Sequence, residues 1–198
     1  MSVAGLVVGL GNPGRQYENT RHNMGFMFID ELLRHTGAVS QSGDKFRCEL
    51  WKGSFPGEPG TWLFAKPQTF MNLSGDCVQP LAAWNRIVPE NILVVHDELD
   101  LAPGRMKFKQ GGGNAGHNGL KSITQRLGTP DFYRLRLGIG RSLHANEDTV
   151  NWVLGRLTTQ ETAAFQKLAP AALTVARLFA SSDIAAATRE ANGFKIQA

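Results

Sequence analysis

The heptapeptide Ile92-Leu93-Val94-Val95-His96-Asp97-Glu98 changes from four apolar residues to three polar ones. A short apolar run rich in β-branched residues is typical of a buried strand. We therefore predict a strand over residues 92–95 that ends where the polar residues begin. In α/β sheets, ligands bind beyond the carboxyl ends of the strands. This stretch thus predicts both a central strand and a candidate functional edge of the sheet.

Strand-like and helix-like patterns alternate along most of the chain. Strands are predicted at residues 6–10, 46–51, 61–65, 92–95, 105–109 and 133–139, and helices at residues 23–35, 76–87, from 158 onward and at 183–191. Such alternation is typical of the α/β class. We expect a single domain over residues 1–198, with a mixed, largely parallel twisted sheet flanked by helices. The polar segments after Leu10, Ala65 and Val95 would all follow strand ends and converge there.

Composition places few limits on function but excludes some classes of protein. The chain has 198 residues, of which 42% are hydrophobic and 19% charged, as in ordinary globular enzymes. Its first residues resemble no signal peptide, and no apolar run reaches the roughly 18 residues of a membrane span. Cys48 and Cys77 lack the CxxC spacing, so we expect free buried thiols. These features predict a cytoplasmic protein that does not enter a membrane.

The hexapeptide Gly9-Leu10-Gly11-Asn12-Pro13-Gly14 matches the G-x-G-x-x-G fingerprint of dinucleotide-binding folds. That fingerprint requires a helix to open at once, with bare N–H groups facing a pyrophosphate. Pro13 removes one of those donors, and residues 15–20 lack apolar periodicity. We therefore predict that the glycines permit a tight turn that presents the Asn12 side chain.

The segment Gly111–Gly119 has five glycines among nine residues, together with two asparagines and one histidine. Ordering so many glycines costs more backbone entropy than ordering other residues. The flanks look like a strand and a helix, so the loop is anchored at both ends. We interpret it as a ligand-facing surface; the alternative is a flexible linker.

Positive charge is concentrated around this loop. Residues 105–141 contain eight basic residues and one acid, Asp131, although the net charge of the whole chain is only +4. Lysine and arginine clusters suit phosphate-rich partners because neutralised phosphates release counterions. A solvated basic face without a partner is the other interpretation.

The predicted loops carry a polar set that suits hydrolysis of a carbonyl ester by water: Asn12, His22, Asn72, Asp97, His117 and Asn118. A histidine can take a proton from water near neutral pH, an aspartate can orient its ring, and amides can donate to an oxyanion. No serine or cysteine lies in a nucleophile-elbow context such as G-x-S-x-G. A covalent acyl-enzyme is therefore not expected.

Several motifs, in order from Leu6 to about Leu157, resemble those of bacterial peptidyl-tRNA hydrolases. They are Gly9–Gly14, Tyr17, Thr20-Arg21-His22-Asn23, Thr69–Gly75, His96–Asp100, Lys107-Phe108-Lys109, the glycine loop through Lys121, and Arg134–Gly140. The part after Thr158 is only weakly diagnostic. The combination is specific, although each motif alone is not.

The resemblance implies hydrolysis of the ester between a peptide and the 3′ end of tRNA, which recycles stalled peptidyl-tRNA. It implies His22 as general base, Asp97 as its orienting partner, and Asn12 as the group that distinguishes a blocked amino acid from a free one. It also implies a monomer without metal or organic cofactor. By the same resemblance, the tRNA end and peptide would be held by Tyr17, Phe70, Asn72 and Asn118, and tRNA phosphate by Lys107, Lys109 and Arg136.

Other interpretations stay open at this stage. Met71 and Phe70 suit the core as well as a cleft wall, and His22 could simply cap the helix that follows. His117 could contact substrate or only order its loop, whereas His96 is interpreted as structural. One rival function is RNA binding without hydrolysis. The other is a metal-dependent hydrolase built on the histidines and Asp97, which no H-E-x-x-H spacing supports.

Overall fold

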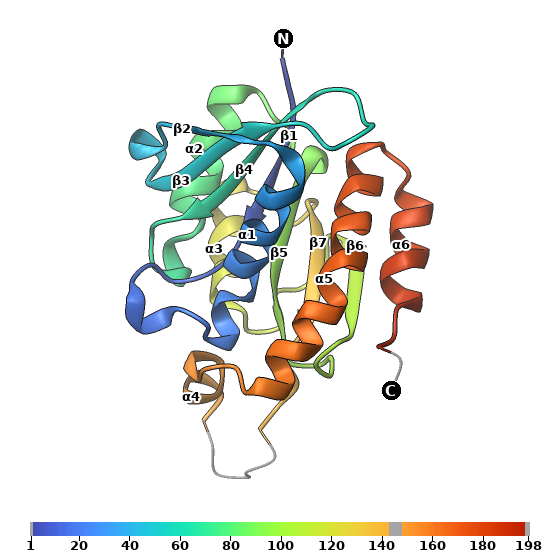
Figure 1. Ribbon diagram of the computed structural model, residues 1–198. Helices are drawn as coiled ribbons and strands as arrows, with labels where there is room; N and C mark the ends of the chain where they lie inside the picture. Colours follow the sequence, from blue (N-terminus) through green and yellow to red (C-terminus); the bar gives the residue numbers. More distant parts are fainter. Residues whose placement is uncertain (1, 143–147, 197–198) are drawn as a thin grey trace.

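One seven-stranded sheet runs through the computed structural model, which describes residues 2–142 and 148–196 (Figure 1). The strands lie in the order β2-β3-β4-β1-β5-β7-β6. Their bounds are β1 Val3–Gly9, β2 Val39–Gln41, β3 Cys48–Gly53, β4 Thr61–Pro67, β5 Ile92–Glu98, β6 Met106–Gln110 and β7 Tyr133–Gly138. The central strands β4, β1, β5 and β7 are parallel, and the strands outside them join by antiparallel pairing. The predicted mixed α/β sheet is confirmed.

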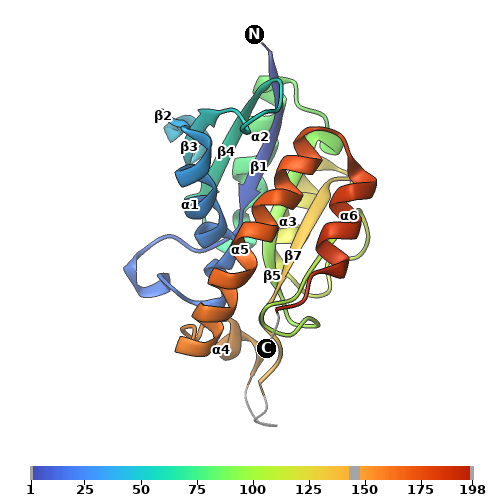
Figure 2. The same ribbon diagram turned by 45° about the vertical axis from the view of Figure 1, so that its right-hand side comes forward.

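Helices cover both faces of the sheet, as Figures 1 and 2 show from two directions. They are α1 Met24–Thr36, α2 Gly75–Asn85, α3 Asn118–Leu127, α4 Thr149–Leu154, α5 Thr159–Ala180 and α6 Ile184–Gly193. Side chains of a strand alternate between faces. Val7 of β1 accordingly packs with residues of α1, α5 and α6, whereas Leu6 and Val8 pack with residues of α2 and α3. The fold therefore has three layers and two apolar cores.

The glycines near the first turn serve close packing between β1 and α1. A Cβ on Gly9 would lie 2.1 Å from the carbonyl oxygen of Gly25, in the first turn of α1. No α-helix opens directly after Gly14; α1 begins only at Met24. This geometry agrees with the prediction that the G-x-G-x-x-G match does not form a dinucleotide site.

Several predicted strand bounds differ from the structure, and two of the differences have a clear structural cause. β5 continues through Glu98 because His96 and Asp97 are paired with β7 residues in the parallel ladder. β3 begins only at Cys48, since Phe46 belongs to a 3₁₀ turn and Arg47 has a left-handed φ of 54°. The two cysteines are free and buried, as predicted. None of the described helices combines the length and hydropathy of a membrane span.

Candidate active site

The predicted convergence of polar segments at the carboxyl edge of the sheet is confirmed for three neighbouring strands. β4, β1 and β5 lie side by side and parallel. Asn12 follows β1, Met71 begins the 3₁₀ turn η4 (Met71–Leu73) after β4, and Asp97 lies at the end of β5. Parallel topology thus brings together groups that are up to 85 positions apart in the sequence.

His22 and Asp97 form a buried pair. Nδ1 of His22, in the 3₁₀ turn η2 (Arg21–Asn23), lies 2.9 Å from Oδ1 and 3.0 Å from Oδ2 of Asp97. An ionised carboxylate only accepts, so this nitrogen carries a proton and donates it. Within residues 2–142 and 148–196, no group hydrogen-bonds Nε2 of the same ring. The lone pair of neutral His22 is therefore on Nε2.

His117 is a second partner of the same carboxylate. Its Nε2 lies 3.0 Å from Oδ1 of Asp97. Its Nδ1 accepts the backbone N–H groups of Gly119 and Leu120, at 3.2 and 3.4 Å, and so caps the N-terminus of α3. Because Nδ1 accepts, the ring proton lies on Nε2 and is donated to Asp97. The sequence left the role of His117 open; the geometry assigns it capping and a bond to Asp97.

The electrostatics of this trio favour an ionised Asp97. Burial would raise the pKa of Asp97, but the interactions with His22 and His117 lower it well below its ordinary range. Burial would likewise lower the pKa of His22, yet the charge and hydrogen bond of Asp97 raise it above 6.5. A carboxylate flanked by two N–H donors is thus held charged inside the protein.

His96 differs from the other two histidines. It is buried, and Nδ1 donates to the backbone oxygen of Asp97 at 2.7 Å. Burial and the neighbouring His117 lower the pKa of His96 to about 3, so its ring is neutral at physiological pH. These contacts agree with the structural role predicted for this residue.

A cavity of about 300 Å³ opens beside the histidines. His22, Asp97, His117 and Asn118 line it, as the sequence suggested for a shared site. Asn114 of the glycine loop also lines it, and lining residues that were not predicted from the sequence include Glu98, Arg141, Thr149, Val150 and Val153. Glu98 could have been predicted as a lining residue, because it directly follows His96 and Asp97 in the same polar run. Nothing in the local sequence indicates that α4 forms part of the wall.

Asn12 lies in a neighbouring hollow of about 460 Å³ that Asn23 also lines. The side chain of Asn23 bonds both backbone groups of Asn12, at 2.8 and 2.9 Å. Oδ1 of Asn12 accepts the N–H of Met71 at 2.7 Å, so its amide NH₂ points the other way, where no residue within 2–142 and 148–196 accepts from it. The turn thus presents Asn12 as predicted, and Asn12 also ties β1 to the segment after β4.

The remaining predicted substrate contacts lie around η4. Phe70 is 53% exposed and meets Tyr17 edge to face, with ring centroids 6.4 Å apart. Asn72 is exposed, whereas Met71 is buried in the apolar core against α2 and α3. Phe70 is thus a surface residue, and Met71 contributes packing.

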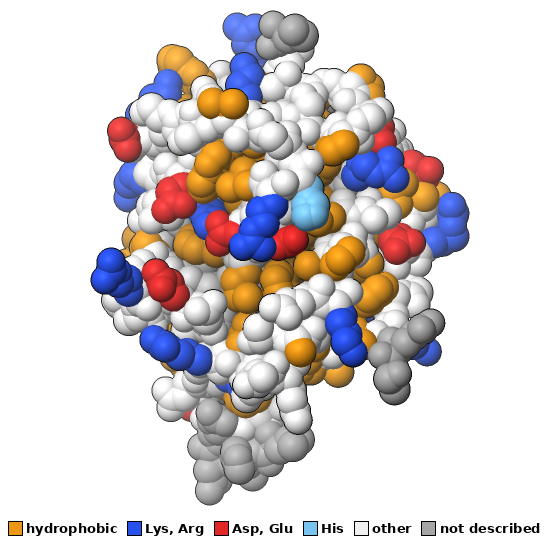
Figure 3. All heavy atoms as spheres, viewed as in Figure 1, with side chains coloured by type: hydrophobic (Ala, Val, Ile, Leu, Met, Phe, Trp, Pro, Cys, Tyr) orange, Lys and Arg blue, Asp and Glu red, His pale blue; other side chains and the backbone are white. Residues whose placement is uncertain are grey.

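Two of the predicted tRNA contacts stand on the edge strand β6. Met106 and Phe108 are buried in the core that α5 and α6 cover, so Lys107 and Lys109 point to the opposite side of the sheet. Lys107 is exposed and Lys109 half-buried. Figure 3 shows the side formed by α1, α5 and α6, where basic, acidic and apolar side chains are mixed. Concentrated positive charge is therefore not a property of that side.

Half of the basic residues in segment 105–141 have partners within the protein, some buried and some on its surface. Arg134 is buried and donates to the carbonyl oxygens of Gly112 and Gly113, which fixes the glycine loop. Ion pairs join Arg136 to Glu98, Arg126 to Asp76 and Arg141 to Asp100. The positive field is therefore smaller than the sequence indicated, and Arg136 carries a neutralising partner.

The site could offer ligands to a metal. One ligand atom each from His22, Asp97 and His117 lies within 4.8 Å of the others. Both ring nitrogens that face Asp97 carry protons in the arrangement above, however, and a metal ligand needs the lone pair. The donor set as arranged fits a hydrogen-bonded trio better than a metal centre.

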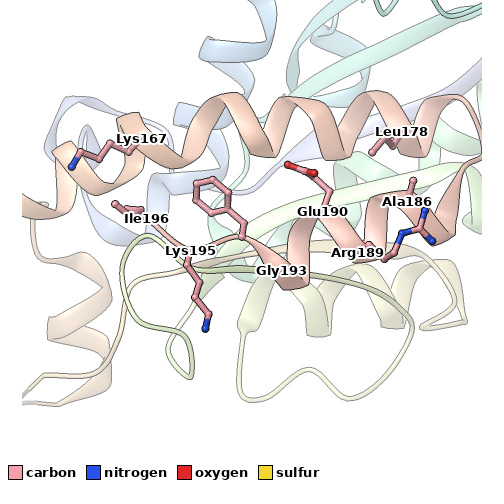
Figure 4. A pocket seen from close by; sticks show the side chains of 9 residues that line it. Lys167, Leu178, Ala186, Arg189, Glu190, Gly193, Lys195 and Ile196 are labelled. Atoms are coloured by element: carbon pink, nitrogen blue, oxygen red, sulfur yellow. The ribbon is translucent and has the colours of Figure 1, made fainter. Parts of the chain in front are cut away.

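A larger hollow, of about 810 Å³, lies between α5 and α6 (Figure 4). Lys167 and Leu178 of α5 and Arg189 and Glu190 of α6 line it. It contains no histidine paired with a carboxylate. The smaller cavity at the strand ends, which does contain such a pair, is therefore the candidate site.

Comparison with known proteins gives consistent matches along the chain. A family profile described as peptidyl-tRNA hydrolase matches residues 6–198. A peptidyl-tRNA hydrolase of Nitratidesulfovibrio vulgaris (strain Miyazaki F) is 59% identical over 201 residues, covering 98% of this chain and 99% of that protein. One of Lawsonia intracellularis is 53% identical, covering 99% and 96%. The crystal structure of peptidyl-tRNA hydrolase from Acinetobacter baumannii superposes with a TM-score of 0.90 at 37% identity, covering 98% and 97%.

Proposed function

Because the chain belongs to the peptidyl-tRNA hydrolase family and is a hydrolase, we propose that it uses His22 as general base to cleave the ester between a peptidyl group and the 3′ end of tRNA. The observation that carries this proposal is the Asp97 carboxylate held between the N–H groups of His22 and His117. That contact leaves a lone pair on Nε2 of His22, beside a cavity.

Water is the nucleophile in the proposed reaction. Nε2 of His22 takes a proton as the water oxygen attacks the ester carbonyl carbon, and Asp97 stabilises the imidazolium that forms. The tetrahedral intermediate then expels the 3′ oxygen of the ribose, which receives the proton from His22. General base catalysis of this kind contributes roughly 10²- to 10⁴-fold.

Amide groups would stabilise the oxyanion and fix the acyl chain. Asn118 lines the same cavity as His22, and the bond from Met71 to Oδ1 of Asn12 fixes the direction in which the Asn12 NH₂ points. We assign Asn12 to recognition of the blocked amino group of the substrate. Tyr17, Phe70 and Asn72 would hold the peptide and the tRNA end, with Phe70 offering an exposed ring for stacking.

Lys107 and Lys109 would bind tRNA phosphate. Neither makes an ion pair with any residue that the structure describes, in contrast to Arg136, which pairs with Glu98. Arg136 would then act on tRNA mainly by holding Glu98 and the β7–β6 edge in place. The protein would act as a monomeric cytoplasmic enzyme in translation, without metal or organic cofactor.

The test is hydrolysis of an N-acetylated aminoacyl-tRNA by the protein and two matched variants. His22→Ala should lose roughly 10²- to 10⁴-fold in single-turnover rate at saturating substrate while retaining affinity for tRNA. The control, His35→Ala, alters an exposed histidine on α1 and should match the parent. Equal rates for His22→Ala and the parent would remove His22 from its role. Binding of tRNA without hydrolysis by the parent would favour the rival RNA-binding function.

A further inference from the structure

Arg21, the residue directly before His22, is a buried cation with an unusually complete set of partners. Its side chain is 7% exposed. Nε and Nη2 donate to the two carboxylate oxygens of Glu161, at 2.8 and 3.0 Å, and Nη1 donates to the carbonyl oxygen of Trp152 at 3.1 Å. The guanidinium carbon also lies 3.5 Å from the centroid of the Trp152 ring. Bidentate pairing and stacking fix the orientation of this side chain.

The partners of Arg21 come from both ends of the connection between α4 and α5. Trp152 belongs to α4, and its indole N–H also donates to the carbonyl oxygen of Gly140, at 2.8 Å. Glu161 closes the capping box of α5: it accepts from the Thr158 N–H at 2.7 Å, and its own N–H donates to Oγ1 of Thr158 at 3.2 Å. Burial would raise the pKa of Glu161, but the bonds from Arg21 and Thr158 lower it, so the carboxylate is charged.

Backbone bonds continue this connection. The N–H of Arg21 donates to Gly155 at 3.0 Å, the N–H of Leu157 donates to Asn19 at 2.8 Å, and Thr20 forms an isolated bridge with Arg156. A Cβ on Gly155 would lie 2.6 Å from Nη1 of Arg21, so the guanidinium packs directly on this backbone. The turn that carries His22 is thereby joined to the turn that follows α4.

Both sides of this junction face the catalytic cavity. His22 lines it from η2, and Thr149, Val150 and Val153 line it from α4. α4 has only six residues and follows residues outside the described part of the chain. A helix this short is not stable by itself. Its position over the cavity therefore depends on contacts such as those of Trp152 with Arg21.

We propose that Arg21 is a positioning residue for the hydrolysis: through Glu161 and Trp152 it sets both the turn that carries His22 and the α4 wall of the cavity. This inference rests on the proposed function, because it assigns a role in that reaction. Arg21 itself contacts neither water nor ester in the proposed chemistry. It acts by fixing the position of Nε2 of His22 relative to the apolar wall that α4 forms.

The experiment compares single-turnover hydrolysis of N-acetylated aminoacyl-tRNA, at saturating substrate and over a range of pH, for the parent and three variants. Arg21→Met removes the donors and keeps much of the side-chain length. Arg21→Lys keeps the charge without the bidentate geometry. The matched control is Arg177→Met, which breaks another arginine–glutamate pair of α5, with Glu58 at 2.6 Å. Arg177 is 16 residues from Glu161 along the helix, about 24 Å at 1.5 Å per residue.

Arg21→Met should lower the rate on the order of 10- to 100-fold, as small misplacements of reacting groups do. Its affinity for uncharged tRNA should equal that of the parent, because Lys107 and Lys109 are untouched. The acid limb of the rate–pH profile should move to lower pH, since a loosened bond to Asp97 leaves burial to dominate the pKa of His22. The rate of Arg21→Lys should fall between those of Arg21→Met and the parent. Arg177→Met should match the parent both in rate and in the position of the acid limb.

A folded Arg21→Met with the parent's rate and acid limb would overturn the proposal, as would an equal loss in Arg177→Met. If Arg21→Met does not fold, Glu161→Gln decides: it keeps the shape of the carboxylate and one acceptor. A reduced rate with a shifted limb in Glu161→Gln would support the role of Arg21, and a parent-like profile would refute it. A parent that fails to hydrolyse the substrate would instead refute the proposed function.

Discussion

Asp97→Asn tests the hydrogen-bond arrangement of the site most directly. The substitution keeps size and shape but replaces one acceptor oxygen with an NH₂ donor. In the parent, the carboxylate accepts from both His22 and His117. The introduced amide has one oxygen and one NH₂. Nδ1 of His22 lies within 3.0 Å of both carboxylate positions, whereas Nε2 of His117 reaches only Oδ1, so an NH₂ now faces His22 at one of them.

The structure determines at which of the two positions the amide oxygen lies. Nδ1 of His117 accepts from Gly119 and Leu120, so Nε2 of His117 stays protonated and needs an acceptor. The oxygen of the introduced amide should therefore turn toward His117, and its NH₂ toward Nδ1 of His22. His22 must then accept at Nδ1 and carry its proton on Nε2, the atom proposed to take a proton from water. We expect a loss of roughly 10²- to 10⁴-fold, the full contribution of the general base.

The assay is single-turnover hydrolysis of N-acetylated aminoacyl-tRNA at saturating substrate. Asp131→Asn makes the same chemical change at an exposed position and should match the parent. Loss of the Asp97 charge also leaves burial as the main influence on the pKa of His22, which should fall, so the acid limb of any residual activity moves to lower pH. A rate for Asp97→Asn within about 3-fold of the parent's would refute the assigned role, because it lies far below the roughly 10²-fold minimum.

The double variant Asp97→Asn with His117→Ala tests the tautomer argument separately. Without His117, nothing fixes the orientation of the introduced amide, so its oxygen can turn fully toward Nδ1 of His22. The double variant should then be more active than Asp97→Asn alone, although α3 loses its N-cap. A double variant no more active than the single one would contradict the proposed orientation of the introduced amide.

Three further outcomes are expected. Lys107→Ala with Lys109→Ala should weaken tRNA binding and lower the slope of log affinity against log salt by about 1–2, whereas Lys52→Ala on β3 should not; an unchanged slope would exclude both lysines from phosphate binding. Gly9→Ala places a Cβ 2.1 Å from the carbonyl oxygen of Gly25 and should destabilise the fold by at least about 1–3 kcal/mol, measured by denaturant unfolding, and an unchanged midpoint would contradict the packing argument. Dialysis against a strong chelator should leave hydrolysis unchanged, because the nitrogens facing Asp97 are protonated; activity lost and restored by zinc would favour the metal-dependent alternative.

The local sequence was sufficient for most of the fold because the relevant interactions are short-range. Apolar runs such as Leu6–Leu10 predict buried strands, and Thr158 with Glu161 predicts the start of α5. The end of β5 was misplaced because polar residues normally leave a strand. There the ladder with β7 overrides local preference, and His96 and Asp97 stay within the sheet.

Part of the candidate active site was also predictable from the sequence. Asn12, His22, Asp97 and Asn118 were named from residue chemistry and family motifs, and the structure places the last three on one cavity. The pair between Arg136 and Glu98, in contrast, was not indicated by the sequence. The sequence gives the position of each charge along the chain but not its nearest neighbour.

The amino-acid sequence alone determined the α/β class, the family and the residue types proposed to perform the chemistry, because periodicity and motifs are properties of consecutive residues. Only the tertiary structure decided which of these groups contact each other and which of them carry a proton or a charge. It places His117 and His22 on the same carboxylate, and it joins Arg21 to Glu161 across 140 positions of sequence. Proton positions, pKa values and buried ion pairs depend on distances of a few ångströms between residues far apart in the chain, and folding alone sets those distances.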